Sequence, residues 1–197
     1  MSKSNAVSRI EQAILHERQG RDRGWWAQMG ASFAADSSVS LSWYTGDGPG
    51  FVAASERMSA QGDTAVHRLS PPVVHVRNDR AIAEVSCGVE FQIRLKGVPA
   101  HLVSYTRLNY RLIERDDRWQ VRRMDAIYER DTLTPACPGD TVDVSSSDVA
   151  GLRTSYALLT HYLRSKGYTI GEDLLGDDRP GEVQAFYDGL LEWLNAA

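Results

Sequence analysis

Apolar residues recur at helical spacing in the first part of the chain. Residues from about 8 to 33 carry them three or four positions apart, which predicts an amphipathic helix. Residues 39–44 alternate and contain two aromatic residues, which predicts a short strand. A glycine-rich turn at 45–50 then leads into a short helix from about 51 to 59. The chain is therefore expected to begin with helices.

From residue 64 onward the pattern changes to the two-residue alternation of strands. Strands are expected at about 64–69, 72–77, 80–95, 101–115 and 118–130. The longest must bend, and Gly88 is a natural position for a bulge. Helices followed by long antiparallel strands predict an α+β fold, in which a curved sheet wraps around the N-terminal helices and encloses a cavity suited to a small molecule.

Helical spacing returns in the last third of the chain. Helices are expected at about 148–166 and 180–194, after a polar linker that follows residue 139. A chain of 197 residues holds one ordinary core. We therefore expect a domain over residues 1–135 and, over 136–197, a linker and C-terminal helical extension that packs on that domain or on a partner subunit.

Composition and charge exclude several classes of binding partner and site. The formal charge of −4 and the absence of a basic stripe argue against nucleic acid as a partner. Two cysteines support neither a disulfide framework nor a cysteine zinc site. The chain lacks a hydrophobic signal region at its start and an apolar run near the ~20 residues of a membrane span. We expect a soluble cytoplasmic protein with no membrane association.

Asp22 is the first candidate for chemistry. At helical spacing Trp26, Met29 and Phe33 share its face, which should bury against a sheet. A carboxylate buried there must be paired, solvated or protonated. The alternative is that Gly20 and Gly24 weaken the helix and that Asp22 is the N-cap of a second helix.

His67 is the second candidate. Strand alternation places it on the same face as Ala65 and Leu69 and opposite Val66 and Arg68, so it should point inward. A lone inward histidine is more often a core residue than a catalyst. A nearby carboxylate would change that interpretation, because it can orient the imidazole as a general base.

A metal site is a weaker hypothesis. The histidines are widely separated on several elements and show no paired ligand spacing. They are His16, His67, His75, His101 and His161. No metal is therefore expected at the candidate site.

With these elements in place, residues 8–131 resemble the SnoaL-like branch of the nuclear-transport-factor-2-like superfamily, which includes polyketide cyclases and scytalone-dehydratase-like proteins. The segments that carry the resemblance are 21–26, 33–36, 66–69, 79–83 and 119–131. The resemblance implies a cone-shaped α+β barrel around one deep pocket, frequent homodimers or homotrimers, and no obligatory cofactor.

The resemblance also implies an activity. Dehydratases, isomerases and cyclases of this group act on cyclic or polycyclic carbonyl compounds by proton transfer, and several use an Asp/His pair that Asp22 and His67 match. The expected function is thus a cofactor-independent lyase or isomerase with a small-molecule substrate. The alternative is a non-catalytic binding protein or accessory subunit, such as a ring-hydroxylating-dioxygenase small-subunit-like protein, because fold alone does not fix function.

One position departs from the family pattern. Dehydratase-type members usually carry a tyrosine five residues before the helix aspartate, and this chain has Glu17 there. Candidates for the pocket are Trp26, Tyr44, Glu90, Tyr110 and Asp125. Asp125 matches a late-strand aspartate of the cyclases, with an ion pair to Arg107 or Arg123 as its alternative role.

Overall fold

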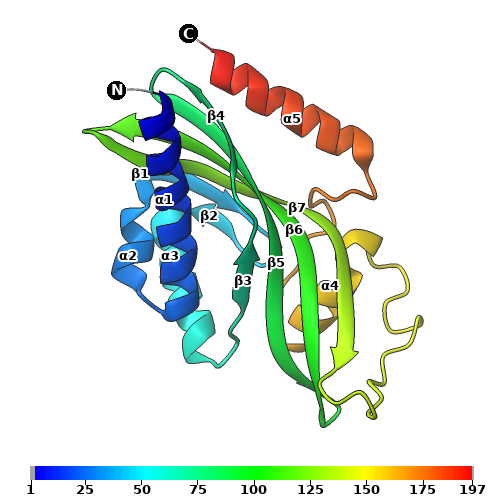
Figure 1. The fold of residues 1–197 in the computed structure, drawn as a ribbon. Coiled ribbons are helices and arrows are strands. Elements are labelled where there is room, and N and C mark those ends of the chain that lie inside the picture. The colour runs from blue at the N-terminus through cyan, green and yellow to red at the C-terminus, as the bar shows by residue number, and fades with distance from the viewer. Residues whose placement is uncertain (1–2, 197) are drawn as a thin grey trace.

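Seven strands form one strongly curved sheet in the computed structural model, which describes residues 3–196 (Figure 1). They are β1 (Phe33–Ser40), β2 (Thr45–Asp47), β3 (Val66–Leu69), β4 (Val73–Arg77), β5 (Arg80–Leu95), β6 (Val98–Arg115) and β7 (Arg118–Pro135). The spatial order is β2-β1-β7-β6-β5-β3, with β4 also paired to β5. The predicted α+β class and curved sheet are confirmed, but β2 and β3 are the edges of an open sheet, so the cone is not a closed barrel.

The three long strands β5, β6 and β7 make up the body of the sheet. They pair antiparallel, as the alternation predicted, whereas β1 runs parallel to β7. The register shifts at Tyr105/Thr106 and at Arg111/Leu112, both between β6 and β7. The bulge predicted at Gly88 is wrong, because β5 pairs with β6 in unbroken register through that position. The irregularities of these long strands lie at the β6–β7 shifts instead.

The N-terminal helices are α1 (Lys3–Arg23), α2 (Trp26–Ala31) and α3 (Gly48–Ala60). The single helix predicted to residue 33 is wrong, because Gly24 has a φ of +69° and ends α1. The residue at the N-cap of α2 is Trp25, and it makes no side-chain capping bond. Asp22 therefore lies in the last turn of α1 and is not a helix cap.

The C-terminal extension covers both faces of the sheet. It contains the short 3-10 helix η1 (Thr154–Tyr156), α4 (Ala157–Ser165) and α5 (Pro180–Asn195). The helix predicted from 148 starts only at Ala157, after a series of turns. On the inner face, ring contacts join Tyr162 of α4 to Phe91, and Tyr156 of η1 to Tyr128.

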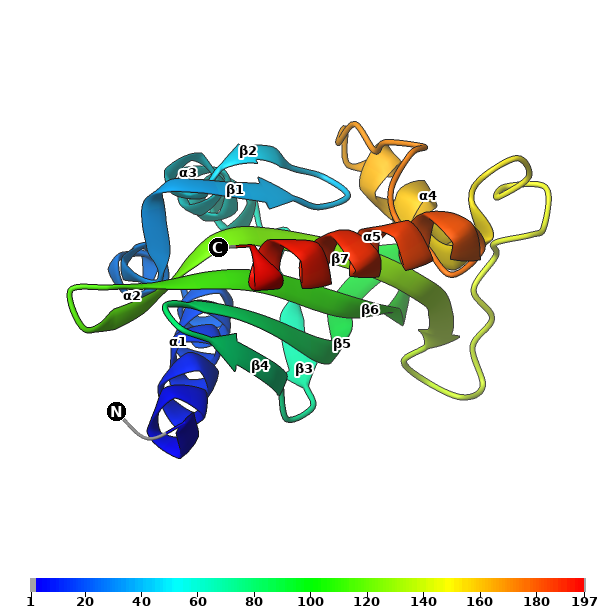
Figure 2. The same ribbon diagram turned by 90° about the horizontal axis from the view of Figure 1, so that it is seen from above.

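The last helix, α5, lies along the outer face of the sheet (Figure 2). Its Leu190 and Leu194 pack on Ile82, whose neighbours Ala81 and Ala83 point to the opposite side, into the main core. Among residues 3–196, the structure has no helix long and apolar enough to cross a membrane.

Candidate functional site

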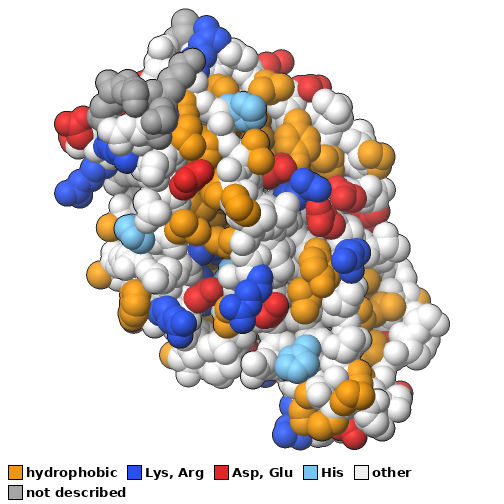
Figure 3. Space-filling model, viewed as in Figure 1, with side chains coloured by type: hydrophobic (Ala, Val, Ile, Leu, Met, Phe, Trp, Pro, Cys, Tyr) orange, Lys and Arg blue, Asp and Glu red, His pale blue; other side chains and the backbone are white. Residues whose placement is uncertain are grey.

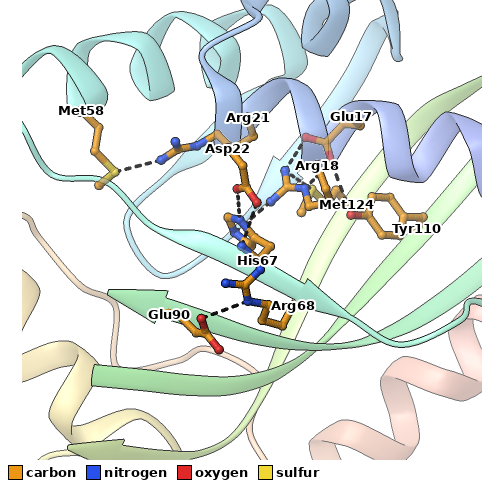
Figure 4. A network of polar contacts seen from close by, with 10 residues as sticks. All are labelled: Glu17, Arg18, Arg21, Asp22, Met58, His67, Arg68, Glu90, Tyr110 and Met124. Carbon is orange, nitrogen blue, oxygen red and sulfur yellow. Dashed lines mark hydrogen bonds and ion pairs between the residues drawn. The ribbon is translucent and has the colours of Figure 1, made fainter. Parts of the chain in front are cut away.

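Asp22 and His67 are in direct contact (Figure 4). Asp22 Oδ1 lies 2.6 Å from His67 Nδ1, and Asp22 Oδ2 accepts a 2.9 Å hydrogen bond from the His67 backbone N–H. The second contact fixes the end of α1 to β3. The carboxylate therefore holds both the imidazole and the strand that carries it.

A third side chain, that of Arg18, contacts the other nitrogen of the imidazole. Arg18 lies one helical turn before Asp22, and its Nη1 is 3.2 Å from His67 Nε2. A guanidinium can only donate and an ionised carboxylate can only accept. Both contacts are satisfied when His67 is neutral, with its proton on Nδ1 and a lone pair on Nε2. This is the tautomer that a general base at Nε2 requires.

Burial and neighbouring charges shift the pKa values of both His67 and Asp22. Burial lowers the pKa of His67 below 6.5, and the charge of Arg18 lowers it further, against the opposing effect of the hydrogen bond that His67 donates to Asp22. Burial alone would raise the pKa of Asp22, but the hydrogen bonds that it accepts from His67, the charge that His67 carries when protonated and the charge of Arg18 outweigh burial and lower it. Near neutral pH the pair is therefore a carboxylate and an uncharged imidazole.

Arg18 is itself held by a fully buried carboxylate. Its guanidinium forms a two-pronged ion pair with Glu17, whose side chain is 0% exposed. The Tyr110 hydroxyl donates to Glu17 Oε2 at 3.4 Å, and Arg18 Nη2 lies 3.9 Å from Met124 Sδ. Burial would lower the pKa of Arg18, but the charge of Glu17 and the phenol of Tyr110 raise it, so Arg18 stays charged.

Arg21 is a second buried cation on the same helix. Its Nη2 donates to Met58 Sδ at 3.2 Å, and its guanidinium lies 5.9 Å from the centre of the Trp43 ring. Burial and the neighbouring charge of Arg18 lower the pKa of Arg21 to about 10, so it too is charged near neutral pH. The last two turns of α1 thus carry two cations and two carboxylates, at positions 17, 18, 21 and 22, of which Arg18 and Asp22 contact the neutral imidazole.

His67 and Arg18 border a small cavity inside the cone, with a volume of about 50 Å³. The other lining residues are apolar or weakly polar: Leu41, Ser42, Trp43, Val89, Phe91, Thr106, Leu108, Ala126, Tyr128, Leu159 and Leu163. An apolar cavity that binds benzene has a volume of about 150 Å³, so this space is too small for a six-membered ring. Because Leu159 and Leu163 belong to α4, the C-terminal extension forms part of the wall of this cavity.

The same two residues also border a larger groove on the outside, between α1 and β3. This groove has a volume of about 500 Å³ and is also lined by Asp22, Gln19 and Arg68. Figure 3 shows this face of the molecule, whose surface is hollowed and has basic and acidic side chains around the hollow. Arg18 and His67 thus form part of the wall between the inner cavity and the outer groove.

Two of the sequence-derived pocket candidates are buried but do not line the inner cavity. Tyr110 is fully buried beside Glu17, and burial raises its pKa well above 10. Asp125 accepts two 2.8 Å hydrogen bonds from Arg123, which is the ion-pair alternative. Its neighbour Ala126 faces the cavity, and the alternation of β7 turns Asp125 to the other side.

The other three candidates make their contacts elsewhere in the structure. Trp26 packs against the main core. The Tyr44 hydroxyl donates to the Asp47 carbonyl at 2.9 Å. Glu90 forms a half-exposed ion pair with Arg68 at 3.1 Å and lines a separate groove. None of the three lines the cavity beside His67.

Sequence reasoning missed Arg18 and the two leucines of α4. A signal for Arg18 was available, since it lies four residues before Asp22 and therefore shares its helical face. The leucines were recognised as an apolar stripe, but their position over the cavity depends on tertiary packing. Among the described residues, no group of three or more histidine, cysteine and acidic side chains could hold a metal ion.

Sequence comparison identifies the family. The SnoaL-like domain model matches residues 3–125, which is more than half of the chain, and the chain belongs to this family. The matched region contains α1, β3 and the Asp22–His67 pair, and it ends before α4. No curated protein matches the chain in sequence.

Solved structures of the nuclear-transport-factor-2-like family share the fold. A hexachlorocyclohexane dehydrochlorinase, LinA-type3 from Novosphingobium barchaimii, is 11% identical and has a TM-score of 0.58, over 73% of this chain and 97% of that one. A putative dehydratase from Streptomyces avermitilis is 14% identical with a TM-score of 0.54, over 64% and 97%. A putative scytalone dehydratase from Novosphingobium aromaticivorans is 15% identical with a TM-score of 0.51, over 74% and 98%.

Proposed function

We propose that the protein is a cofactor-independent proton-transfer enzyme, a dehydratase, isomerase or cyclase acting on a small cyclic or polycyclic carbonyl compound. The observation that carries the proposal is the double contact of Asp22 with the backbone and Nδ1 of His67. Similarity to a dehydrochlorinase and to putative dehydratases supports the same class of chemistry.

In the proposed reaction His67 is the general base. Its Nε2 takes a proton from the carbon next to a carbonyl group, and the electron pair of that C–H bond forms a C=C bond as the carbonyl π pair moves to oxygen. The enolate then collapses. Either a hydroxyl group on the next carbon leaves as water with the proton from His67, or that proton returns at another carbon.

The size of the inner cavity favours a second candidate, a non-catalytic binding protein. A cavity of about 50 Å³ does not hold a cyclic substrate unless Arg18 or α4 moves. A protein that merely binds a ligand in the outer groove would need no such movement. The two candidates differ in whether the ligand is chemically changed.

The experiment that tests the proposal measures whether the protein catalyses the exchange of substrate C–H hydrogens for deuterium in D₂O. The purified protein is incubated with cyclic ketones, hydroxyketones and aromatic polyketide mimics, and deuterium uptake and water loss are followed by mass spectrometry. We expect exchange or dehydration that His67→Gln removes and His16→Gln, a change at an exposed histidine of α1, preserves. Ligands that stabilise both proteins against heat but remain unchanged would establish the binding protein instead.

The rate of this exchange should depend on pH in one direction. Because burial lowers the pKa of His67, the neutral form of the base predominates above pH 6.5. We expect a rate that is constant from pH 7 to 8 and falls below a midpoint lower than 6.5. The measurement is the initial exchange rate of one active ketone between pH 4.5 and 8. A midpoint above 7 would show that another group is the base.

A further inference from the structure

We propose that Arg18 is the group that binds the negatively charged oxygen in the reaction, and that substrate enters between Arg18 and His67. This inference rests on the proposed function and deepens it. It assigns the substrate class as compounds whose acidic C–H is next to a carbonyl or carboxylate oxygen. Glu17 is then a positioning residue, which acts through Arg18.

The first argument is the position of the two reactive atoms. Arg18 Nη1 and His67 Nε2 lie 3.2 Å apart and occupy each other's hydrogen-bonding site. The lone pair on Nε2 cannot accept a proton from carbon while it accepts one from the guanidinium. A substrate oxygen that takes over the Arg18 donor frees this lone pair and brings the neighbouring C–H to it.

The second argument is the charge along this row of residues. Glu17 is negative, Arg18 positive and Asp22 negative, with neutral His67 between the last two. Proton transfer creates an enolate and an imidazolium. The order then becomes Glu17⁻, Arg18⁺, enolate⁻, His67⁺ and Asp22⁻, so each new charge has an opposite charge on both sides. Such fixed charges stabilise the transition state more than the uncharged substrate.

The third argument is space. Arg18 and His67 both line the inner cavity of about 50 Å³ and the outer groove of about 500 Å³. Moving these two side chains apart would connect the inner cavity with the outer groove, at the point where His67 and Arg18 meet. A substrate can thus enter from the groove between α1 and β3 without displacing α4 from the sheet.

Glu17 limits how the guanidinium can respond. Its two oxygens hold Nε and Nη2 of Arg18, and leave Nη1 as the donor directed at His67. Because the guanidinium is planar and rigid, these two contacts fix its plane and the direction in which Nη1 donates.

The test is binding of acetate, a four-heavy-atom carboxylate with the O–C–C unit of an enolate. Acetamide, its uncharged isostere, is the control, and the Nε2 resonance of ¹⁵N-labelled His67 is followed at constant ionic strength. We expect acetate to shift this resonance saturably, with half-saturation no lower than about 0.04 mM, the limit for a ligand of four non-hydrogen atoms. Bound acetate should also raise the pKa of His67, because an anion favours the charged imidazolium.

The matched variant replaces both members of the ion pair, Glu17→Gln with Arg18→Met, which leaves no unpaired buried charge. We expect the acetate shift to be lost in this double variant. A shift that is equal for acetamide, or that persists in the double variant, would overturn the assignment of Arg18. Deuterium exchange that fails in the wild-type protein while acetate binding succeeds would instead reject the proposed function and leave the anion site standing.

Discussion

Replacing Asp22 with asparagine is expected to lower the turnover of an active ketone by about 10²–10⁴-fold, the contribution of a well-placed acid–base group. Asparagine has one acceptor oxygen, whereas the carboxylate uses two, for the His67 backbone and for Nδ1. If the new amide group donates to Nδ1, the imidazole proton moves to Nε2. The base then carries a hydrogen where it needs a lone pair.

The same substitution has a second expected effect, on the pH dependence. Asp22 raises the pKa of His67 against the effect of burial, so its removal should move the acidic midpoint to a still lower pH. Asp36→Asn is the matched control, because Asp36 is a partly exposed carboxylate in an ion pair with Arg115 on the outside of the molecule. The rates of all three proteins are measured against pH. An Asp22→Asn protein with more than a third of wild-type turnover would show that this carboxylate does not orient the base.

The parts of the site that sequence alone could predict are those set by local pattern. Alternation placed His67 on the inward face of β3, and its side chain is indeed 9% exposed. The helical spacing marked the face of Asp22, although the helix ends one residue later, at Arg23, because Gly24 adopts a left-handed conformation. The long strands β5, β6 and β7 were predicted well, since each alternates over many residues.

The rest of the site depends on contacts between distant residues. Periodicity cannot show that Arg18 reaches an imidazole 49 positions away, or that Glu17, the departure from the family pattern, neutralises it. It also cannot place Leu159 and Leu163 at the inner cavity rather than at a subunit interface. Asp125 was assigned to the pocket by resemblance, but the observed alternation of β7 pairs it with Arg123 instead.

The ion pair of Glu17 and Arg18 leads to the largest expected effect on stability. Both side chains are almost completely buried, at 0% and 4% exposed. Glu17→Gln removes the negative charge and leaves a buried guanidinium without its partner. We expect the free energy of unfolding to fall by about 3–5 kcal/mol, as when one member of a buried pair is removed. Urea denaturation measures this as a lower midpoint with an unchanged m-value.

The double variant, Glu17→Gln with Arg18→Met, shows whether the pair serves stability or function. Removing both charges avoids their desolvation cost, so we expect its free energy of unfolding to be close to that of the wild type or higher. Asp143→Asn, which breaks an exposed ion pair with Lys96, should not move the urea midpoint measurably. If the double variant is stable but inactive, the buried pair is kept for its action on substrate. A double variant as unstable as Glu17→Gln alone would show that the pair is needed to hold α1 in the core.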